Sequence, residues 1–107
     1  MELVEKKCKP CEAGTPPLTE KEITELKKQV HPGWQVSENM KITNSYSFVN
    51  YSHTMDFVNK VADLAESEGH HPDMHVYYGK VVIDLWTHSV KGLSENDFIL
   101  AAKIDRI

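Results

Sequence analysis

The strongest constraint on the fold of this chain is an apolar stripe of helical period between residues 52 and 69. Six apolar side chains recur at the three- and four-residue spacing that shares one face of an α-helix: Phe57, Val58, Val61, Ala62, Leu64 and Ala65. Ser52 is the expected N-terminal cap of this helix, and Gly69 is expected to end it. A helix with one apolar face needs an apolar partner, so the flanking segments must supply the rest of a core.

Both flanking segments have the composition of strands. Over residues 34–48 the apolar side chains are aromatic or mostly β-branched and follow no helical period, and Asn39 lies midway, which favours a hairpin. Over residues 75–85 two apolar runs flank Gly79-Lys80. This pattern predicts a second hairpin with a tight turn, closed at Gly92.

Two further helices are marked by their caps. Thr19 and Glu22 have the spacing of a capping box, and apolar residues of helical period follow as far as the His-Pro-Gly sequence at 31–33. Proline disfavours helical geometry in the residue before it, and glycine accepts a left-handed cap, so we expect the first helix over about 19–31. Ser94 is expected to cap the last helix.

The elements therefore follow the order α-β-β-α-β-β-α. Strands joined by hairpins are antiparallel, and four strands alone cannot bury a core, so we expect an α+β fold with a four-stranded antiparallel sheet and three helices packed on one face. The 107 residues suit one domain. We expect that domain over residues 18–107 and an N-terminal arm over 1–17, whose prolines and glycine favour irregular, loosely packed backbone.

The expected arm carries a Cys-x-x-Cys pair, Cys8 and Cys11. Such a pair can bind metal or cycle between thiol and disulfide. A zinc site needs four ligands, however, and the chain has no second pair of this kind. Reduced thiols are the favoured interpretation, and their role is left open.

Composition and charge argue against some classes of function. The chain is 40% hydrophobic and 26% charged, and no apolar run approaches the ~20 residues that a membrane crossing needs. The first residues lack the apolar stretch of an export signal, which favours a cytoplasmic protein. The formal net charge of -4 and the lack of a basic cluster argue against nucleic-acid binding.

Four of the six histidines lie between residues 70 and 88: His70, His71, His75 and His88. The first two fall where a helix ends and a strand begins, a junction from which side chains can project into a shared pocket. A histidine at a helix C-terminus can also serve the helix dipole alone. Glu66 could orient His70, four residues on, or lie free on the surface. Asp97 could support a pocket or mainly cap the last helix.

Motifs in this region form a longer pattern: Glu66, His70-His71-Pro72, Tyr77-Tyr78, Thr87-His88, Gly92-Leu93-Ser94 and Asp97. The pattern resembles the signature of pterin-4a-carbinolamine dehydratases, and Trp34 and the Pro-Pro-Leu sequence at 16–18 are further points of similarity. Gly69 departs from it, because many relatives carry Asp or Asn there, and Trp86 replaces a small residue of the animal members. The resemblance implies a hydro-lyase of α+β fold that forms homodimers or homotetramers.

The implied reaction is loss of the 4a-hydroxyl from 4a-hydroxytetrahydropterin, which gives quinonoid dihydropterin and water. Hydroxide is a poor leaving group and the N5 proton must be lost, so an acid and a base are needed, and histidine can be either near neutral pH. N5 supplies the electrons, so we expect no metal and no cofactor besides the pterin substrate. The resemblance implies these catalytic residues: His70, His71 and His88. It implies that six residues bind the substrate or support the site: Glu66, His70, His71, Thr87, His88 and Asp97.

Two other functions compete with this one. His71, His75 and His88 could bind zinc, although Pro72 stops the helix and removes the four-residue alignment of the first two rings. Animal relatives also act as dimerisation partners of a transcription factor, so the chain could be a non-catalytic dimerisation or protein-interaction module. The side chain of the physiological pterin is not specified, nor is the pathway, which could serve an aromatic amino acid hydroxylase or molybdopterin metabolism.

Overall fold

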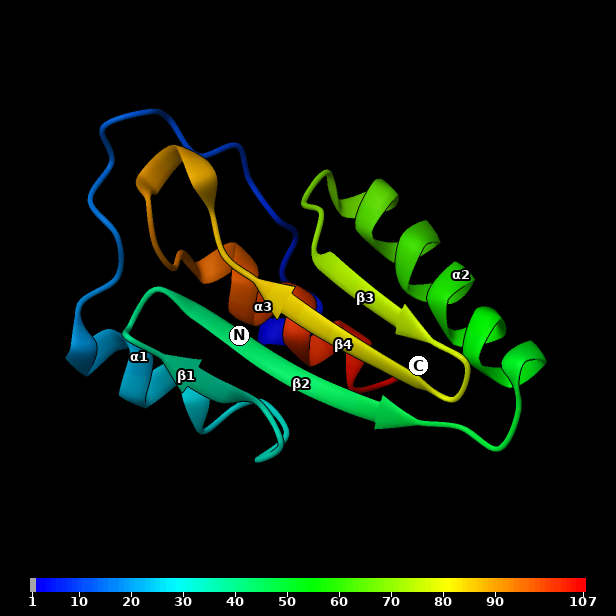
Figure 1. Ribbon diagram of the computed structural model, residues 1–107. Coiled ribbons are helices and arrows are strands. Elements are labelled where there is room, and N and C mark those ends of the chain that lie inside the picture. Colours follow the sequence, from blue (N-terminus) through cyan, green and yellow to red (C-terminus); the bar gives the residue numbers. More distant parts are fainter. Residues whose placement is uncertain (1) are drawn as a thin grey trace.

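The computed structural model describes residues 2–107, and its elements follow the predicted order (Figure 1). Three α-helices and four strands are present: α1 (Glu20–Lys27), β1 (Gln35–Ser37), β2 (Lys41–Ser47), α2 (Tyr51–Glu68), β3 (Asp73–Tyr77), β4 (Lys80–Leu85) and α3 (Glu95–Ile104). Two short 3₁₀ turns are added to them: η1 (Leu3–Glu5) and η2 (His88–Val90). The predicted sequence of helices and hairpins is therefore confirmed.

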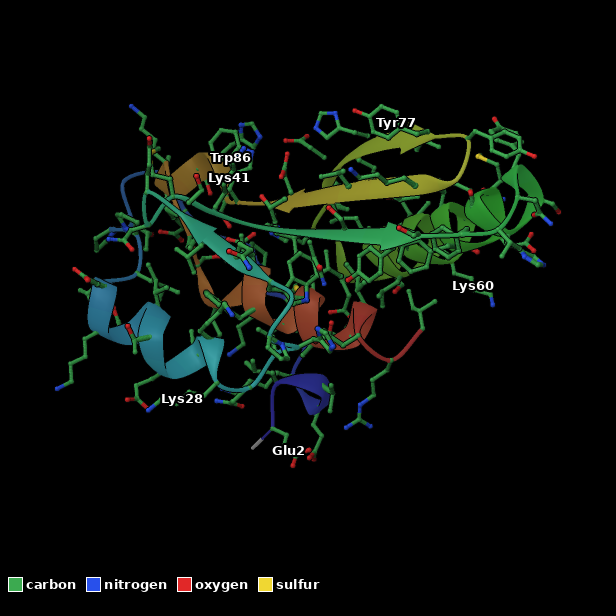
Figure 2. The ribbon with its side chains drawn as sticks, turned by 60° about the horizontal axis from the view of Figure 1, so that its bottom comes forward. Glu2, Lys28, Lys41, Lys60, Tyr77 and Trp86 are labelled. Carbon is green, nitrogen blue, oxygen red and sulfur yellow. The ribbon has the colours of Figure 1, made fainter. Side chains whose placement is uncertain are left out.

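The strands form one antiparallel sheet in the order β1-β2-β4-β3. The two central strands, β2 and β4, pair from Ile42↔Leu85 to Ser47↔Lys80, so each hairpin supplies one central and one edge strand. All three helices lie on the same side of this sheet, and the other side carries side chains such as Tyr77 and Trp86 (Figure 2). The predicted α+β class is confirmed.

The core lies between the sheet and the helices, with α3 at its centre. On β4, Val81, Ile83 and Leu85 are fully buried and alternate with more exposed residues, as expected for a sheet with one covered face. Most residues of α3 are buried, Phe98 and Leu100 completely. Each such side chain stabilises the fold by about 1.5–3 kcal/mol. Groups on the first turn of α3 are therefore held on a rigid support.

Two predicted helix boundaries are wrong. α1 ends at Lys27 rather than near residue 31, because the N–H groups of residues 28–30 bond to carbonyls three residues back instead of four. α2 begins after Asn50 rather than Ser52, because the Asn50 side chain accepts the His53 N–H at 2.8 Å. Both Asn and Ser can cap a helix, and the extended backbone that a cap requires falls at Asn50.

The N-terminal segment packs more closely than predicted. Leu3 in η1 is only 2% exposed and belongs to the main core, where η1 lies against α3. Farther along, the Cys8 and Lys9 amides are bonded to side chains of the folded body. The prediction of a loosely packed arm is thus wrong for these residues, while the division into an arm over 1–17 and a domain over 18–107 stays a prediction. Within residues 2–107 no helix combines the length and apolarity needed to cross a membrane.

Candidate active site

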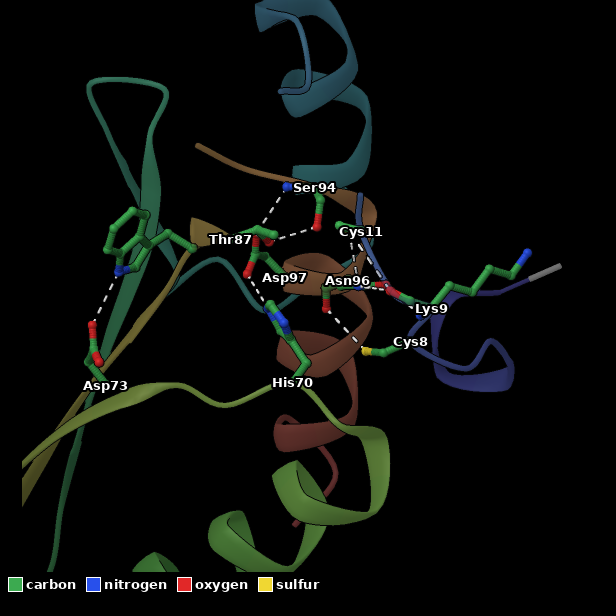
Figure 3. Close-up of polar contacts among 10 residues, drawn as sticks. Cys8, Lys9, Cys11, His70, Asp73, Thr87, Ser94, Asn96 and Asp97 are labelled. Carbon is green, nitrogen blue, oxygen red and sulfur yellow. Dashed lines mark hydrogen bonds and ion pairs between the residues drawn. The ribbon is translucent and has the colours of Figure 1, made fainter. Parts of the chain in front are cut away.

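The histidine pair is positioned by the way α2 ends. Gly69 has a left-handed backbone with φ 67°, a conformation that glycine adopts without the steric cost paid by other residues. The His70 N–H then donates to the Ala65 carbonyl, the bond that closes a Schellman motif. The predicted end of this helix at Gly69 is confirmed. The chain turns sharply there, so His70 leaves the helical path and points toward α3 (Figure 3).

His70 contacts the carboxylate of Asp97 on the first turn of α3. The distance from its Nε2 to Asp97 Oδ1 is 2.6 Å, and Asp97 is completely buried. The second carboxylate oxygen accepts the Thr87 hydroxyl at 2.8 Å and the Ser94 N–H at 3.0 Å. A carboxylate accepts hydrogen bonds, so Nε2 carries a proton and Nδ1 is the nitrogen that can exchange a proton with a ligand.

Asp97 therefore combines the two roles considered for it. Its bond to the Ser94 N–H is part of the predicted capping box of α3. Its bond to His70 connects the same side chain to the histidine pair. A buried carboxylate needs several donors to offset the loss of water, and here the donors come from α3, the end of α2 and the segment after β4.

Glu66 contacts His71, not His70. The distance from Glu66 Oε1 to His71 Nε2 is 2.6 Å, and both side chains are largely exposed, at 79% and 62%. Of the two roles considered for Glu66, an exposed position is the one observed and a contact with His70 is not, because Gly69 ends the helix and the four-residue alignment does not continue past it. This contact stabilises little by itself, since water screens it, but it orients the His71 ring.

His88 begins the short turn η2 and lies against Trp86. Their ring centroids are 3.7 Å apart at an interplanar angle of 38°. The indole N–H of Trp86 donates to Asp73 Oδ2 at 3.1 Å, which anchors the indole at the start of β3. Trp86 therefore packs on the exposed His88 ring and restricts its orientation.

The side chains of His70, His71 and His88 line one pocket of about 480 Å³. Its lining includes four of the predicted site residues: His70, His71, Thr87 and His88. The remaining two, Glu66 and Asp97, bond to the His71 and His70 rings. The lining also includes residues that the sequence analysis did not assign to the site: Lys9, Pro10, Cys11, Asp73 and Asn96. Lys9, Pro10, Cys11 and Asn96 reach the pocket through long-range contacts, so no local pattern identifies them, whereas Asp73 directly follows the His-His-Pro sequence.

A family model for pterin 4 alpha carbinolamine dehydratase matches residues 16–107. The chain belongs to this family. The resemblance inferred from the histidine motifs is confirmed, and so is the enzyme class, because a carbinolamine dehydratase is a hydro-lyase. The match covers the sheet, the three helices and every predicted site residue.

Relatives and solved structures agree with this family. A protein of Nitrosomonas eutropha, provisionally named pterin-4-alpha-carbinolamine dehydratase, is 50% identical over 106 residues, which are 99% of this chain and 93% of the relative. The crystal structure of a "transcriptional coactivator/pterin dehydratase" from Brucella melitensis is 34% identical with a TM-score of 0.78, and the alignment covers 84% of this chain and 96% of that one.

A more distant structure shares the fold alone. It is a pterin dehydratase-like protein described as a RuBisCO assembly factor in the alpha-carboxysome. It is 24% identical with a TM-score of 0.57, over 68% of this chain and 83% of that one. Proteins with this fold are thus described as a dehydratase in one case and as an assembly factor in another.

The site does not have the arrangement of the competing zinc hypothesis. His75 is paired with Asp84 on the open face of the sheet at 3.3 Å, and His71 is paired with Glu66. His75 is also absent from the lining of the pocket. Across residues 2–107 no group of three or more His, Cys, Asp or Glu side chains could hold a metal ion.

Proposed function

We propose that this protein catalyses the dehydration of 4a-hydroxytetrahydropterin to quinonoid dihydropterin and water by histidine acid-base chemistry. The observation that carries the proposal is the buried Asp97–His70 pair, set in a pocket that His71 and His88 also line. Family membership supplies the substrate class.

The reaction needs two proton transfers. The N5 lone pair forms the new C4a=N5 bond as the C4a–O bond breaks, one group gives a proton to the departing hydroxide, and another removes the N5 proton. Positioned acid-base groups commonly accelerate such steps by ~10² to 10⁴-fold. We assign the base to His70, because the Asp97 carboxylate stabilises the imidazolium that forms when Nδ1 takes a proton. We assign the acid to His88, which lines the same pocket from the start of η2.

The other predicted residues bind or position. His71, held by Glu66, holds the substrate, and Thr87 helps to fix Asp97. No metal and no cofactor besides the pterin substrate is required in this mechanism.

We propose that the enzyme works in the cytoplasm and recycles tetrahydrobiopterin or a related pterin, beside an aromatic amino acid hydroxylase where the cell has one.

We also propose a homodimer or homotetramer. β1 and β3 are sheet edges, and the β3 hairpin exposes Val76, Tyr77 and Tyr78. Unpaired edges with apolar side chains favour association. Sedimentation at micromolar concentration should show a dimer or tetramer, and a 12.2 kDa monomer would contradict this.

Stopped-flow kinetics with synthetic carbinolamine test the catalytic assignment. His70→Ala and His88→Ala should each lower kcat by the order of 10²-fold or more, and the double variant should approach the buffer rate. His71→Ala should chiefly raise KM. His75→Ala is the matched control, because its ring lies outside the pocket, and it should keep wild-type kinetics. Near-native kcat in the double variant, with its fold intact by circular dichroism, would refute the assignment.

The same assay addresses a second candidate, a non-catalytic interaction module. The Brucella melitensis relative is named both a coactivator and a dehydratase, which is the observation in favour of this candidate. Wild-type protein that binds pterin without accelerating dehydration over buffer would favour the module. Loss of activity in His75→Ala, together with stoichiometric zinc, would instead favour the metal site.

A further inference from the structure

Part of the candidate pocket comes from outside the matched dehydratase region. Lys9, Pro10 and Cys11 line the same cavity as His70 and His88, yet the family model begins at residue 16. We call residues 9–11 the arm wall. In the sequence, Cys11 belonged to a cysteine pair whose role was left open, and the fold brings it beside the histidines.

The arm wall is held by Asn96, the second residue of α3. Asn96 is 7% exposed, its Oδ1 accepts the Lys9 N–H at 3.0 Å, and its Nδ2 donates to the Lys9 carbonyl. The same Nδ2 lies 3.4 Å from the Cys11 sulfur (Figure 3). A side-chain amide that satisfies both polar groups of one backbone residue fixes the path of the chain there.

A second anchor lies just before the arm wall. The Cys8 N–H donates to Glu68 Oε1 at 2.9 Å, and Glu68 Oε2 is paired with Lys103 at 2.7 Å. The Cys8 thiol lies 3.6 Å from the Asn96 carbonyl. Burial, with the adjacent Glu68 charge, raises the pKa of the Cys8 thiol to about 12, so near neutral pH this thiol is protonated and unreactive.

The arm wall and His70 are positioned by one turn of helix. Asn96 holds Lys9, and the next residue, Asp97, holds His70. Because both side chains project from the same buried turn of α3, the two sides of the pocket keep a constant spacing. A group bound at the histidines therefore meets the arm wall at a defined position.

We infer that the arm wall, residues Lys9, Pro10 and Cys11, is a substrate-binding surface of this dehydratase that contacts the part of the pterin that does not react. This inference rests on the proposed function. The arm wall contributes to binding and not to proton transfer, since none of its residues takes part in the Asp97–His70 bond. Damage to it should raise KM and leave kcat nearly unchanged, the signature of lost uniform binding.

Thiol alkylation in the otherwise native protein tests the inference without measuring turnover. In a Cys8→Ser variant, Cys11 is the only thiol, and its rate of reaction with N-ethylmaleimide is measured with and without saturating 7,8-dihydrobiopterin, a stable pterin. The ligand should slow alkylation at least fivefold. Calorimetric titration of the same sample with the pterin shows independently whether it binds.

Bulk added to the arm provides a kinetic test with a matched control. Cys11→Trp should raise KM about tenfold with kcat within twofold, whereas Ala13→Trp, two residues farther on and outside the pocket lining, should leave both unchanged. Pterin binding with unchanged Cys11 alkylation overturns the inference and leaves the proposed function standing. No pterin binding by the wild type overturns both. Because alkylation needs no bulky substitution, the inference stays testable even if Cys11→Trp fails to fold.

Discussion

The two helix-hairpin units of this protein have the same order of elements but differ in the contacts made at the junction between the helix and the next strand. The first unit is α1-β1-β2 and the second is α2-β3-β4. In each, the helix is followed by a His-Pro sequence, His31-Pro32 or His71-Pro72, before the next strand. In each, this junction is bonded to an aspartate of α3 or its C-terminal end, Asp105 for the first unit and Asp97 for the second.

The aspartates bind different kinds of donor. Asp105 accepts the His31 backbone N–H at 2.8 Å and the Trp34 indole N–H at 2.9 Å. The His31 ring accepts the Gly33 N–H at 2.9 Å, so it is used inside its own turn. Asp97 accepts an imidazole N–H of His70 whose other nitrogen can act on a ligand. The first junction is structural, and the second is a candidate for catalysis.

The helix ends account for this difference. α2 ends with Gly69 in the left-handed conformation, which turns the chain at once and directs His70 to α3. α1 ends with Lys28 in the right-handed conformation and continues through a tighter turn, so the backbone of His31 approaches Asp105 instead of its ring. Corresponding junctions in a repeated outline therefore need not have the same chemistry.

The largest expected contrast is between Asp97→Asn and Asp105→Asn. Asp105→Asn places an amide N–H against a fixed donor, and Asp97→Asn either does the same or forces the His70 proton onto the other ring nitrogen, so each variant should lose about 1–3 kcal/mol of unfolding free energy. Only Asp97→Asn should also lower kcat, by the order of 10²-fold, because His70 loses its carboxylate partner. Urea unfolding and stopped-flow kinetics measure the two effects. A similar fall in kcat for Asp105→Asn would mean that the two junctions are not functionally distinct.

Glu68 joins the second unit to the arm and to α3, and we expect the contribution of these contacts to stability to depend on pH. Burial raises its pKa, but the Cys8 amide, the Lys103 bond and the Lys103 and Lys7 charges outweigh burial, so the net pKa lies below the ordinary 4.5. A carboxyl with a lowered pKa stabilises the fold above its ordinary pKa and loses that effect as pH falls through the folded value. Glu68→Gln should cost about 1.5–3 kcal/mol at pH 7.

The cost of Glu68→Gln should shrink steadily below pH 4.5, where the wild-type carboxyl itself becomes protonated. Urea titrations of both proteins between pH 7 and pH 3 measure the difference. Glu66→Gln is the control, since its side chain is 79% exposed, and it should change stability little at any pH. A Glu68→Gln cost that is the same at pH 7 and pH 3 would contradict the ionic origin.

The smallest expected effect comes from substitutions at the C-terminal ends of α2 and α1. Gly69→Ala meets no atom within 4 Å, but φ 67° is costly for alanine, so about 1 kcal/mol of stability should be lost. Lys28→Ala, at the right-handed end of α1, should change thermal stability very little. Gly69→Asn should fall between wild type and Gly69→Ala, because asparagine tolerates this conformation. An alanine variant as stable as wild type would show that the left-handed end is not required.

Local patterns in the sequence were sufficient for most of the fold. Some features depend only on residues close together in the sequence, so they can be predicted without the rest of the molecule: the helical period of residues 57–65, the capping boxes at Thr19 and Ser94, and the helix end at Gly69. The cap of α2 was misplaced because Asn50 and Ser52 are both suitable, and the choice depends on how the chain leaves β2.

The motif pattern likewise identified the family and the residues that meet at the pocket. Histidines at 70, 71 and 88 are recognisable by type and spacing, and the fold places all three in one cavity. The hydrogen-bond partner of each histidine could not be predicted in the same way. Helical spacing made His70 one possible partner of Glu66, but Glu66 bonds to His71 instead, since the helix ends at Gly69.

The tertiary structure alone decided which groups surround the histidines. The Asp97–His70 bond spans 27 residues, and the Asn96–Lys9 bonds span 87. Contacts of this range follow from how α3 packs in the core, and no spacing rule in the sequence encodes them. The sequence by itself therefore determined the helices, the hairpins and the chemistry available at 70–88. Packing around one buried turn of α3 decided that His70 is paired with the buried carboxylate of Asp97, and it brought the arm wall to the pocket.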